Sequence, residues 1–475
     1  MADDLLKFVS IDQQMPSKRD QNARRLDFDE IYAEYDPVAA KEQASRCSQC
    51  GVPFCHIHCP LGNNIPDWLK LTAEGRLEEA YEMASATNNM PEICGRICPQ
   101  DRLCEGNCVI EKDFDAVTIG SVEKYIADTA WEKGWIKPIV PTLERTESVG
   151  IIGAGPAGLA AAEQLRFAGF QVHIYDRYDR AGGLLIYGIP GFKLEKDVVG
   201  RRTGRLAQSG IIFHMDFEVG RDENLSDLRE KHDALLIATG VYRPRSLKVP
   251  GVGLGNIHEA LDYLVASNRK SFGDVVPEFD SGALDANGKH VVVIGGGDTA
   301  MDCVRTAVRQ GAKSVKCLYR RDRENMPGSA REVKNAEEEG VEFVWLAGPE
   351  AFVGDDTVSG VRAYRMRLGA GDSTGRQAPE PVPDSAFQLD CDLAIMALGF
   401  EPEDLPALFG APELRVSRWG TVTVNHQSMM TNLDGVFAAG DIVRGASLVV
   451  WAIRYGRDAA SSMIKILNQK ARSAA

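Results

Sequence analysis

The sequence of 475 residues lacks any apolar run of about 18 residues, so it predicts no membrane-spanning segment. A secretory signal is also absent from the N-terminal stretch MADDLLKFVSIDQQ, which is acidic and has no long apolar core. Positive charge is scarce, and a formal net charge of −14 excludes a broad footprint for nucleic acid or an anionic membrane. A cytoplasmic protein is expected, and structural disulfides are rare in that compartment.

Cysteine is nearly missing from the second half of the chain. Only Cys303, Cys317 and Cys391 occur after residue 108, and we expect them to be buried like small hydrophobic side chains. No catalytic triad is recognisable either. Nucleophilic catalysis by a side chain is therefore not predicted.

The first part of the chain, in contrast, holds eight of the eleven cysteines, in CSQCGVPFCHIHCP and CGRICPQDRLCEGNC. The first stretch has the spacing C-x2-C-x4-C-x3-C-P, which is close to the C-x2-C-x2-C-x3-C-P run of bacterial ferredoxins. Structural zinc sites usually use two C-x2-C pairs, and only one such pair occurs here. We therefore predict two [4Fe–4S] clusters in preference to two zinc sites, with His56 and His58 outside the ligand sets. The predicted ligands are Cys47, Cys50, Cys55, Cys59, Cys94, Cys98, Cys104 and Cys108.

In ferredoxins the last cysteine of such a run binds the other cluster, and the same crossing predicts two ligand sets here. Cys47, Cys50 and Cys55 form one set with a distant cysteine, expected to be Cys108. The second set is Cys59, Cys94, Cys98 and Cys104.

The surroundings of these cysteines have a helical pattern. Asp36 is a predicted N-cap before Pro37, and apolar residues follow at helical spacing from Trp68 to Ala84. Residues 1–145 are therefore expected to form a helical domain that binds two [4Fe–4S] clusters.

From residue 148 the pattern changes to strand, glycine turn and helix. The turn Gly153-x-Gly155-x-x-Gly158 lies between a strand and a helix, and Asp176 ends the next strand, where an acid binds a ribose hydroxyl. A second unit repeats this order around Gly295-x-Gly297-x-x-Ala300. Its second strand ends on Arg320 and Arg321, which suit the 2′-phosphate of NADP(H). The first unit is expected to bind FAD and the second NADPH.

Both units close with an apolar strand that runs into glycine, in DALLIATG and CDLAIMALG. A later strand reaches Gly440 and Asp441, so the NADPH unit is predicted to be inserted into the FAD fold. The expected division is 1–145 for the cluster domain, 146–285 for the first part of the FAD domain, 286–400 for the NADPH domain and 401–475 for the end of the FAD domain. The fold class is α/β, with two Rossmann-like domains that resemble the disulfide-reductase class of flavoproteins.

Further stretches narrow the resemblance: PLGNNIPDW, TNNMPEICGRICP, GGLLIYGIPGFKLEK and GGGDTAMDC. Over essentially the whole chain they resemble the small (β) subunit family of bacterial NADPH-dependent glutamate synthases and, more distantly, the N-terminal half of dihydropyrimidine dehydrogenase. This resemblance implies FAD binding by Gly153, Ala154, Gly155, Pro156, Ala157, Gly158, Asp176, Gly183, Leu184, Thr239, Gly240, Gly440 and Asp441. It implies NADPH binding by Gly295, Gly296, Gly297, Asp298, Thr299, Arg320 and Arg321. Glu123 matches a glutamine ligand of the dihydropyrimidine dehydrogenase relatives, so it is an alternative to Cys94.

The resemblance also implies a function. An electron-input subunit would oxidise NADPH at FAD and pass electrons through the clusters to the FMN of a large (α) subunit, which makes L-glutamate from L-glutamine and 2-oxoglutarate. No cysteine lies between Cys108 and Cys303, so the redox-active pair of the disulfide reductases is missing and electrons are expected to leave through the cluster domain. Two alternatives are an input subunit for another reductase, of pyrimidines or ferredoxin, and a non-catalytic interaction module that binds zinc.

Overall fold

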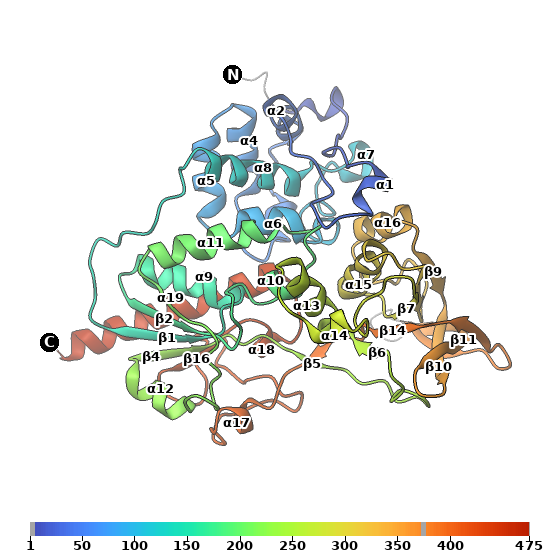
Figure 1. Cartoon of the computed structure of the whole chain (residues 1–475). Coiled ribbons are helices and arrows are strands. Elements are labelled where there is room, and N and C mark those ends of the chain that lie inside the picture. The colour runs from blue at the N-terminus through green and yellow to red at the C-terminus, as the bar shows by residue number, and fades with distance from the viewer. Residues whose placement is uncertain (1–4, 372–376, 475) are drawn as a thin grey trace.

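The computed structural model describes residues 5–371 and 377–474. A helical domain lies above two α/β units, and the C-terminal helix runs beneath it along the first of them (Figure 1). In the described part of the chain, no helix combines the length and the apolar character needed to cross a membrane.

The helical domain is built from short segments packed around a small core. They are η1 (Lys7–Val9), α1 (Gln21–Arg24), α2 (Pro37–Ser45), α3 (Phe54–Ile57), α4 (Ile65–Ala73), α5 (Leu77–Ser85), α6 (Pro91–Ile97), η2 (Gln100–Arg102), α7 (Glu111–Phe114) and α8 (Ile119–Glu132). Asp36 caps α2 as predicted, because its carboxylate accepts from the backbone N–H groups of Val38 and Ala39 at 2.8 Å. The apolar run from Trp68 to Ala84 forms two helices, since Gly75 adopts a φ of +77° and ends the first.

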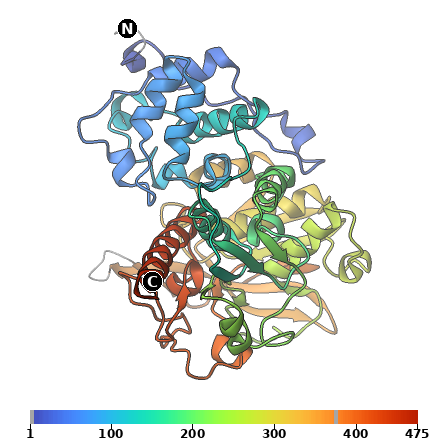
Figure 2. The ribbon, with the colours of Figure 1, turned by 90° about the vertical axis from the view of Figure 1, so that its left-hand side faces the viewer.

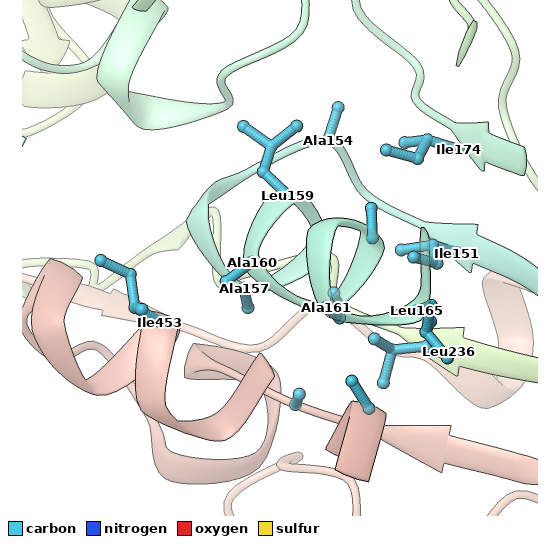
Figure 3. Close-up of a cluster of buried hydrophobic side chains, with 14 of the residues drawn as sticks. Ile151, Ala154, Ala157, Leu159, Ala160, Ala161, Leu165, Ile174, Leu236 and Ile453 are labelled. Carbon is cyan, nitrogen blue, oxygen red and sulfur yellow. The ribbon is translucent and has the colours of Figure 1, made fainter. Parts of the chain in front are cut away.

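The first α/β unit has a parallel sheet of order β16-β4-β1-β2-β3. Its strands are β1 (Ser148–Ile152), β2 (Gln171–Tyr175), β3 (Ile212–His214), β4 (Ala234–Ile237) and β16 (Val436–Ala438). Its helices are α9 (Pro156–Phe167), α10 (Leu184–Tyr187), α11 (Lys196–Gln208), α12 (Leu225–Lys231), α17 (Leu405–Leu408), α18 (Asp441–Arg444) and α19 (Val449–Ala474). In its core, α9 packs between the sheet and α19, so that Ile151, Ala160 and Ile453 belong to one buried cluster (Figure 3). The predicted interruption is present, because β16 returns to pair with β4.

The second α/β unit has a parallel sheet of order β6-β14-β7-β8-β9 and an antiparallel sheet beside it. The parallel strands are β6 (Ile257–Glu259), β7 (His290–Ile294), β8 (Ser314–Tyr319), β9 (Glu342–Trp345) and β14 (Leu393–Met396). The antiparallel strands are β10 (Ala347–Gly354), β11 (Val358–Gly371), β12 (Gln377–Pro381) and β13 (Phe387–Asp390). The helices are α13 (Ala260–Ser271), α14 (Pro277–Asp280), α15 (Asp298–Arg309) and α16 (Ala330–Glu338).

The chain crosses between the two α/β units twice, and the crossings pair with each other as β5 (Arg243–Pro244) and β15 (Phe400–Glu401). The second crossing lies at the expected boundary near residue 400. The first lies well before residue 286, because β6 pairs with β14 and so belongs to the second unit. The expected start at 286 came from the glycine turn, and an edge strand of three residues before it has no comparable sequence signal.

Buried ion pairs join the helical domain to both α/β units. Arg202 of α11 binds Glu92 of α6 through two hydrogen bonds of 2.8 Å, and both side chains are fully buried. On the other side, α1 lies against α16 of the second unit (Figures 1 and 2), where Arg24 pairs with Glu338 at 2.7 Å and with Glu339 at 3.3 Å. These ion pairs therefore link the helical domain to each of the two α/β units.

Candidate cofactor sites

The first glycine turn links β1 to α9 and leaves an open face. Gly153 has a φ of +113°, and a Cβ there would lie 2.4 Å from the carbonyl oxygen of Ala238. A Cβ on Gly158 would lie 2.0 Å from the carbonyl oxygen of Gly153, so this glycine allows α9 to pack on the turn. A Cβ on Gly155, in contrast, would meet no heavy atom within 4 Å. The space in front of Gly155 is the place where a ligand phosphate can approach the backbone.

A cleft of about 1150 Å³, partly open to solvent, runs from this turn to the second glycine turn. Most of the predicted flavin-binding residues line it: Gly153, Gly155, Pro156, Ala157, Asp176, Leu184, Thr239, Gly240, Gly440 and Asp441. Asp298 and Thr299 of the second turn line the same cleft. The remaining three predicted residues are buried and do not line the cleft: Ala154, Gly158 and Gly183. Gly183 has a φ of +56° and packs on Gly155.

Polar groups in the cleft fit a dinucleotide. The Oγ1 of Thr239 is buried and has no hydrogen-bond partner among the described residues, so it can form a hydrogen bond to a ligand. Asp176 accepts from the backbone N–H of Ala154 at 2.6 Å and from that of Tyr178 at 2.9 Å, so its carboxylate is fixed at the end of β2. Burial raises the pKa of Asp176, and it raises the pKa of Asp441 to about 6.

A side pocket extends the cleft beyond Asp176, and most of the residues that line it were not predicted from the sequence. Arg177 binds Glu403 at 2.9 Å and lies over the ring of Tyr242, 4.8 Å from its centroid. Phe217 also lines this pocket. Together with the cleft, this pocket has room for an extended ligand of the size of a dinucleotide. The missed residues Tyr242 and Glu403 come from the loops around the crossing strands, which no sequence motif marks.

The second glycine turn has the same design. A Cβ on Gly295 would lie 2.2 Å from the carbonyl oxygen of Ala397, and one on Gly296 would enter the ring of Tyr319, whereas Gly297 faces open space. Ala300 is fully buried in the position that Gly158 occupies in the first turn.

Arg320 and Arg321 follow β8 directly, as predicted, and lie outside the cleft. Arg320 is exposed. The Nε of Arg321 is buried without a hydrogen-bond partner in the described chain, so a donor is available at the end of β8.

Four of the eight clustered cysteines line one cavity together with Glu123. They are Cys59, Cys94, Cys98 and Cys104. Glu123 accepts a hydrogen bond of 3.0 Å from Asn88, and burial raises the pKa of Glu123 to about 8. Both alternatives for the last ligand, Cys94 and Glu123, therefore face this cavity.

The other four cysteines form a second group. Burial, together with the charges of Cys47, Cys108 and Cys50, raises the pKa of Cys55 to about 12, so these thiols lie close together. Among the described residues, no three His, Cys, Asp or Glu side chains converge as closely as the ligands of a single metal ion. Thiolates around a four-iron cubane are necessarily farther apart than those around one ion.

The two histidines near the thiols have other environments. His56 shares a hydrogen bond of 2.9 Å with the carbonyl oxygen of Asn63, and His58 is exposed. Cys303, Cys317 and Cys391 are fully buried among apolar side chains, as expected.

The thiol cavity and the cleft share a wall. Cys98 lines the thiol cavity, while its neighbours Ile97 and Pro99 line the cleft. From α19, Val450 lines the cavity and Val449 lines the cleft. The predicted flavin site and the predicted cluster site are therefore neighbours across this shared wall.

Comparisons with known proteins agree with this arrangement. Residues 24–135 match the family "dihydropyrimidine dehydrogenase domain II, 4Fe-4S cluster", and residues 147–456 match "pyridine nucleotide-disulphide oxidoreductase". The glutamate synthase [NADPH] small chain of Azospirillum brasilense is 67% identical over 98% of this chain and 97% of its own length. The small chain of Escherichia coli K12 is 44% identical over 98% of this chain and 100% of its own.

This chain belongs to the family of glutamate synthase [NADPH] small chains. The family resemblance expected from the sequence is confirmed, and so are the oxidoreductase class and the fold of a disulfide-reductase-type flavoprotein behind an iron–sulfur domain. Among solved structures, FprA of Mycobacterium tuberculosis in complex with NADPH has a TM-score of 0.59 at 19% identity, over 70% of this small chain and 86% of FprA. That likeness concerns the fold of the two α/β units. The match of the helical domain to a 4Fe-4S family favours iron–sulfur over the zinc alternative.

Proposed function

We propose that this chain is the electron-input subunit of a glutamate synthase. It oxidises NADPH at FAD and passes the electrons through two [4Fe–4S] clusters to the FMN of a large (α) subunit, which forms L-glutamate from L-glutamine and 2-oxoglutarate. The observation that carries the proposal is the single cleft between both glycine turns, which shares a wall with a four-thiol cavity at Ile97–Pro99 and at the start of α19.

The chain's own residues would bind and orient the cofactors. The N-termini of α9 and α15 offer free backbone N–H groups to the two pyrophosphates, and Asp176 offers its carboxylate to the FAD ribose. Arg320 and Arg321 are proposed to bind the 2′-phosphate and so to select NADPH over NADH. FAD supplies the step from a hydride to single electrons, so no side-chain acid or base is needed.

The two thiol groups support an order of electron transfer. The group of Cys59, Cys94, Cys98 and Cys104, with Glu123 as the alternative to Cys94, adjoins the cleft and is proposed to hold the inner cluster. The group of Cys47, Cys50, Cys55 and Cys108 is proposed to hold the outer one. The groups are neighbours, because the charge of Cys55 acts on the pKa of Cys104.

The surroundings of the outer group support a protein partner. Four apolar side chains close in sequence to these cysteines are exposed: Val52, Phe54, Ile57 and Val109. These side chains are proposed to contact the partner where the electrons would leave, since contiguous exposed apolar surface marks interaction sites. A cytoplasmic location is proposed as well, since none of the eleven cysteines, all of which are described, forms a disulfide.

The proposal is tested with the purified chain, assayed alone and with the large subunit. Alone it should contain FAD and about eight irons, four for each cluster, and should reduce a tetrazolium dye with NADPH without making glutamate. Adding the large subunit should restore glutamate formation from L-glutamine and 2-oxoglutarate. Failure to support this reaction, with activity instead toward a pyrimidine or ferredoxin reductase, would favour the alternative partner. Glutamate formation by the isolated chain would contradict the proposal.

A further inference from the structure

The iron–sulfur domain reaches the second glycine turn directly, through the residues that follow Cys98. Arg102 donates to Asp298 with an Nη2 to Oδ2 distance of 3.2 Å. Next to it, Asp101 accepts from the hydroxyl of Ser329 at 3.1 Å and from the backbone N–H of Ala330 at 2.9 Å. The loop after a predicted cluster ligand is thus joined to the predicted NADPH site by side-chain contacts.

Asp298 occupies a position that is unfavourable for a phosphate ligand. It is the first residue of α15, follows the open Gly297 and lines the cleft. Its Oδ1 accepts from the backbone N–H of Ser329 at 2.9 Å, which fixes the carboxylate beside the turn. A pyrophosphate at the N-terminus of α15 would therefore lie next to a negative side chain, and the repulsion would offset part of the helix contribution.

Arg102 is the cation available to compensate this charge. Other cations line a pocket together with Asp298, among them Lys193, Arg305 and Arg331, and each of these three already has a partner. Lys193 pairs with Asp302 at 2.8 Å and with Glu332 at 3.8 Å. Arg305 pairs with Glu339 at 2.9 Å, and Arg331 donates to Gln100. The side chain of Arg102 is 40% exposed, so its guanidinium keeps part of its hydration while it pairs with Asp298.

We propose that Arg102 is a positioning residue of the NADPH site, contributed by the iron–sulfur domain. By pairing with Asp298 it keeps the turn electrically neutral where the dinucleotide phosphates bind. The inference rests on the proposed use of NADPH by this site. It makes the loop Pro99–Arg102 a shared part of the cluster domain and the coenzyme site.

The test measures NADP⁺ binding to the holoprotein by isothermal titration calorimetry. Arg102→Gln should raise the Kd for NADP⁺ about tenfold, which corresponds to about 1.4 kcal/mol. Arg102→Lys should stay within about threefold of wild type, because it retains the charge. Asp298→Asn keeps the acceptor for the N–H of Ser329, so Arg102→Gln combined with Asp298→Asn should restore binding to the level of Asp298→Asn alone.

Kinetics with a tetrazolium dye provide the second measurement. The KM for NADPH should follow the Kd across these variants, while kcat changes less than about twofold. Arg76→Gln is the matched control, because Arg76 is an exposed arginine of the same domain that pairs with Glu74 and Glu79. Flavin and iron contents equal to wild type establish that each variant is intact.

Two results would overturn the inference. One is an unchanged Kd in Arg102→Gln, and the other is a double variant that binds as weakly as Arg102→Gln alone. Failure of the proposed use of NADPH has a different signature, because wild type itself would then not bind NADP⁺.

Discussion

Gly155→Ala separates the stability of the fold from the binding of FAD. Gly155 has a φ of −79° and a ψ of −177°, which alanine adopts without strain, and an added Cβ meets no heavy atom within 4 Å. In the protein without cofactor the substitution should therefore be neutral or stabilising, by about 0.4–1 kcal/mol, because alanine has fewer unfolded conformations than glycine.

In the proposed FAD complex the same Cβ would lie where the backbone approaches the pyrophosphate. A methyl group forced into a packed contact costs about 1–3 kcal/mol, so the Kd for FAD should rise roughly 5- to 150-fold. Gly158→Ala should behave differently. Its Cβ would lie 2.0 Å from the carbonyl oxygen of Gly153, so the fold itself should be destabilised with or without FAD.

The assay compares FAD content by visible absorbance, the Kd from titration of FAD into the apoprotein, and the thermal unfolding of both apoproteins. Gly200→Ala is the control, since Gly200 is an exposed residue of α11 whose Cβ also meets nothing within 4 Å. It should retain FAD as wild type does. Wild-type affinity for FAD in Gly155→Ala, or loss of apoprotein stability in that variant, would refute the reasoning.

Three further predictions concern the cluster, the coenzyme and pH. Cys50→Ser should lower iron content from about eight toward four per chain and stop glutamate formation with the large subunit, while NADPH still bleaches the flavin; full iron content would contradict the ligand assignment. Neutralising both Arg320 and Arg321 should raise the KM for NADPH far more than that for NADH, since each charge-assisted bond is worth about 1.5–3 kcal/mol; use of both coenzymes by wild type would show the assignment to be wrong. Burial lowers the pKa of His232 to about 4, below the usual value of about 6.5, so the folded chain binds fewer protons than the unfolded chain between these values. Its contribution to the free energy of unfolding should therefore fall by up to about 3 kcal/mol as pH decreases through that window, and His232→Asn should reduce the pH dependence of the melting temperature; an unchanged dependence would argue against it.

Local sequence patterns predicted the parts of the site that depend on backbone geometry. The glycine turns and Asp176 could be recognised because a close approach to phosphate permits few residue types at fixed spacing. Side chains that arrive from distant segments have no such signal. Tyr242 and Glu403 reach the flavin side only because β5 and β15 pair, which is a property of the assembled fold.

The choice between Cys94 and Glu123 shows the same limit. Sequence spacing offers Cys94 as a ligand, and the resemblance to dihydropyrimidine dehydrogenase offers Glu123. The fold brings both to one cavity with Asn88 between them, since Asn88 donates to Glu123 and its Oδ1 lies 3.7 Å from the sulfur of Cys94. Arg102 could not be predicted as part of the coenzyme site, because its link to Asp298 joins segments 196 residues apart.

The interrupted FAD unit has a consequence for synthesis on the ribosome. The sheet lacks its edge strand until β16 emerges, and the cleft lacks Gly440 and the wall from α19 until nearly the whole chain has been made. At roughly 5–20 residues per second, β16 follows β4 by roughly 10–40 s. The strands of the second unit from Ile257 to Met396 are all made in that interval. We therefore expect the NADPH unit to fold first, and FAD to be taken up only at the end of translation. A nascent chain stalled before α19 should not retain flavin, however well the rest of it has folded.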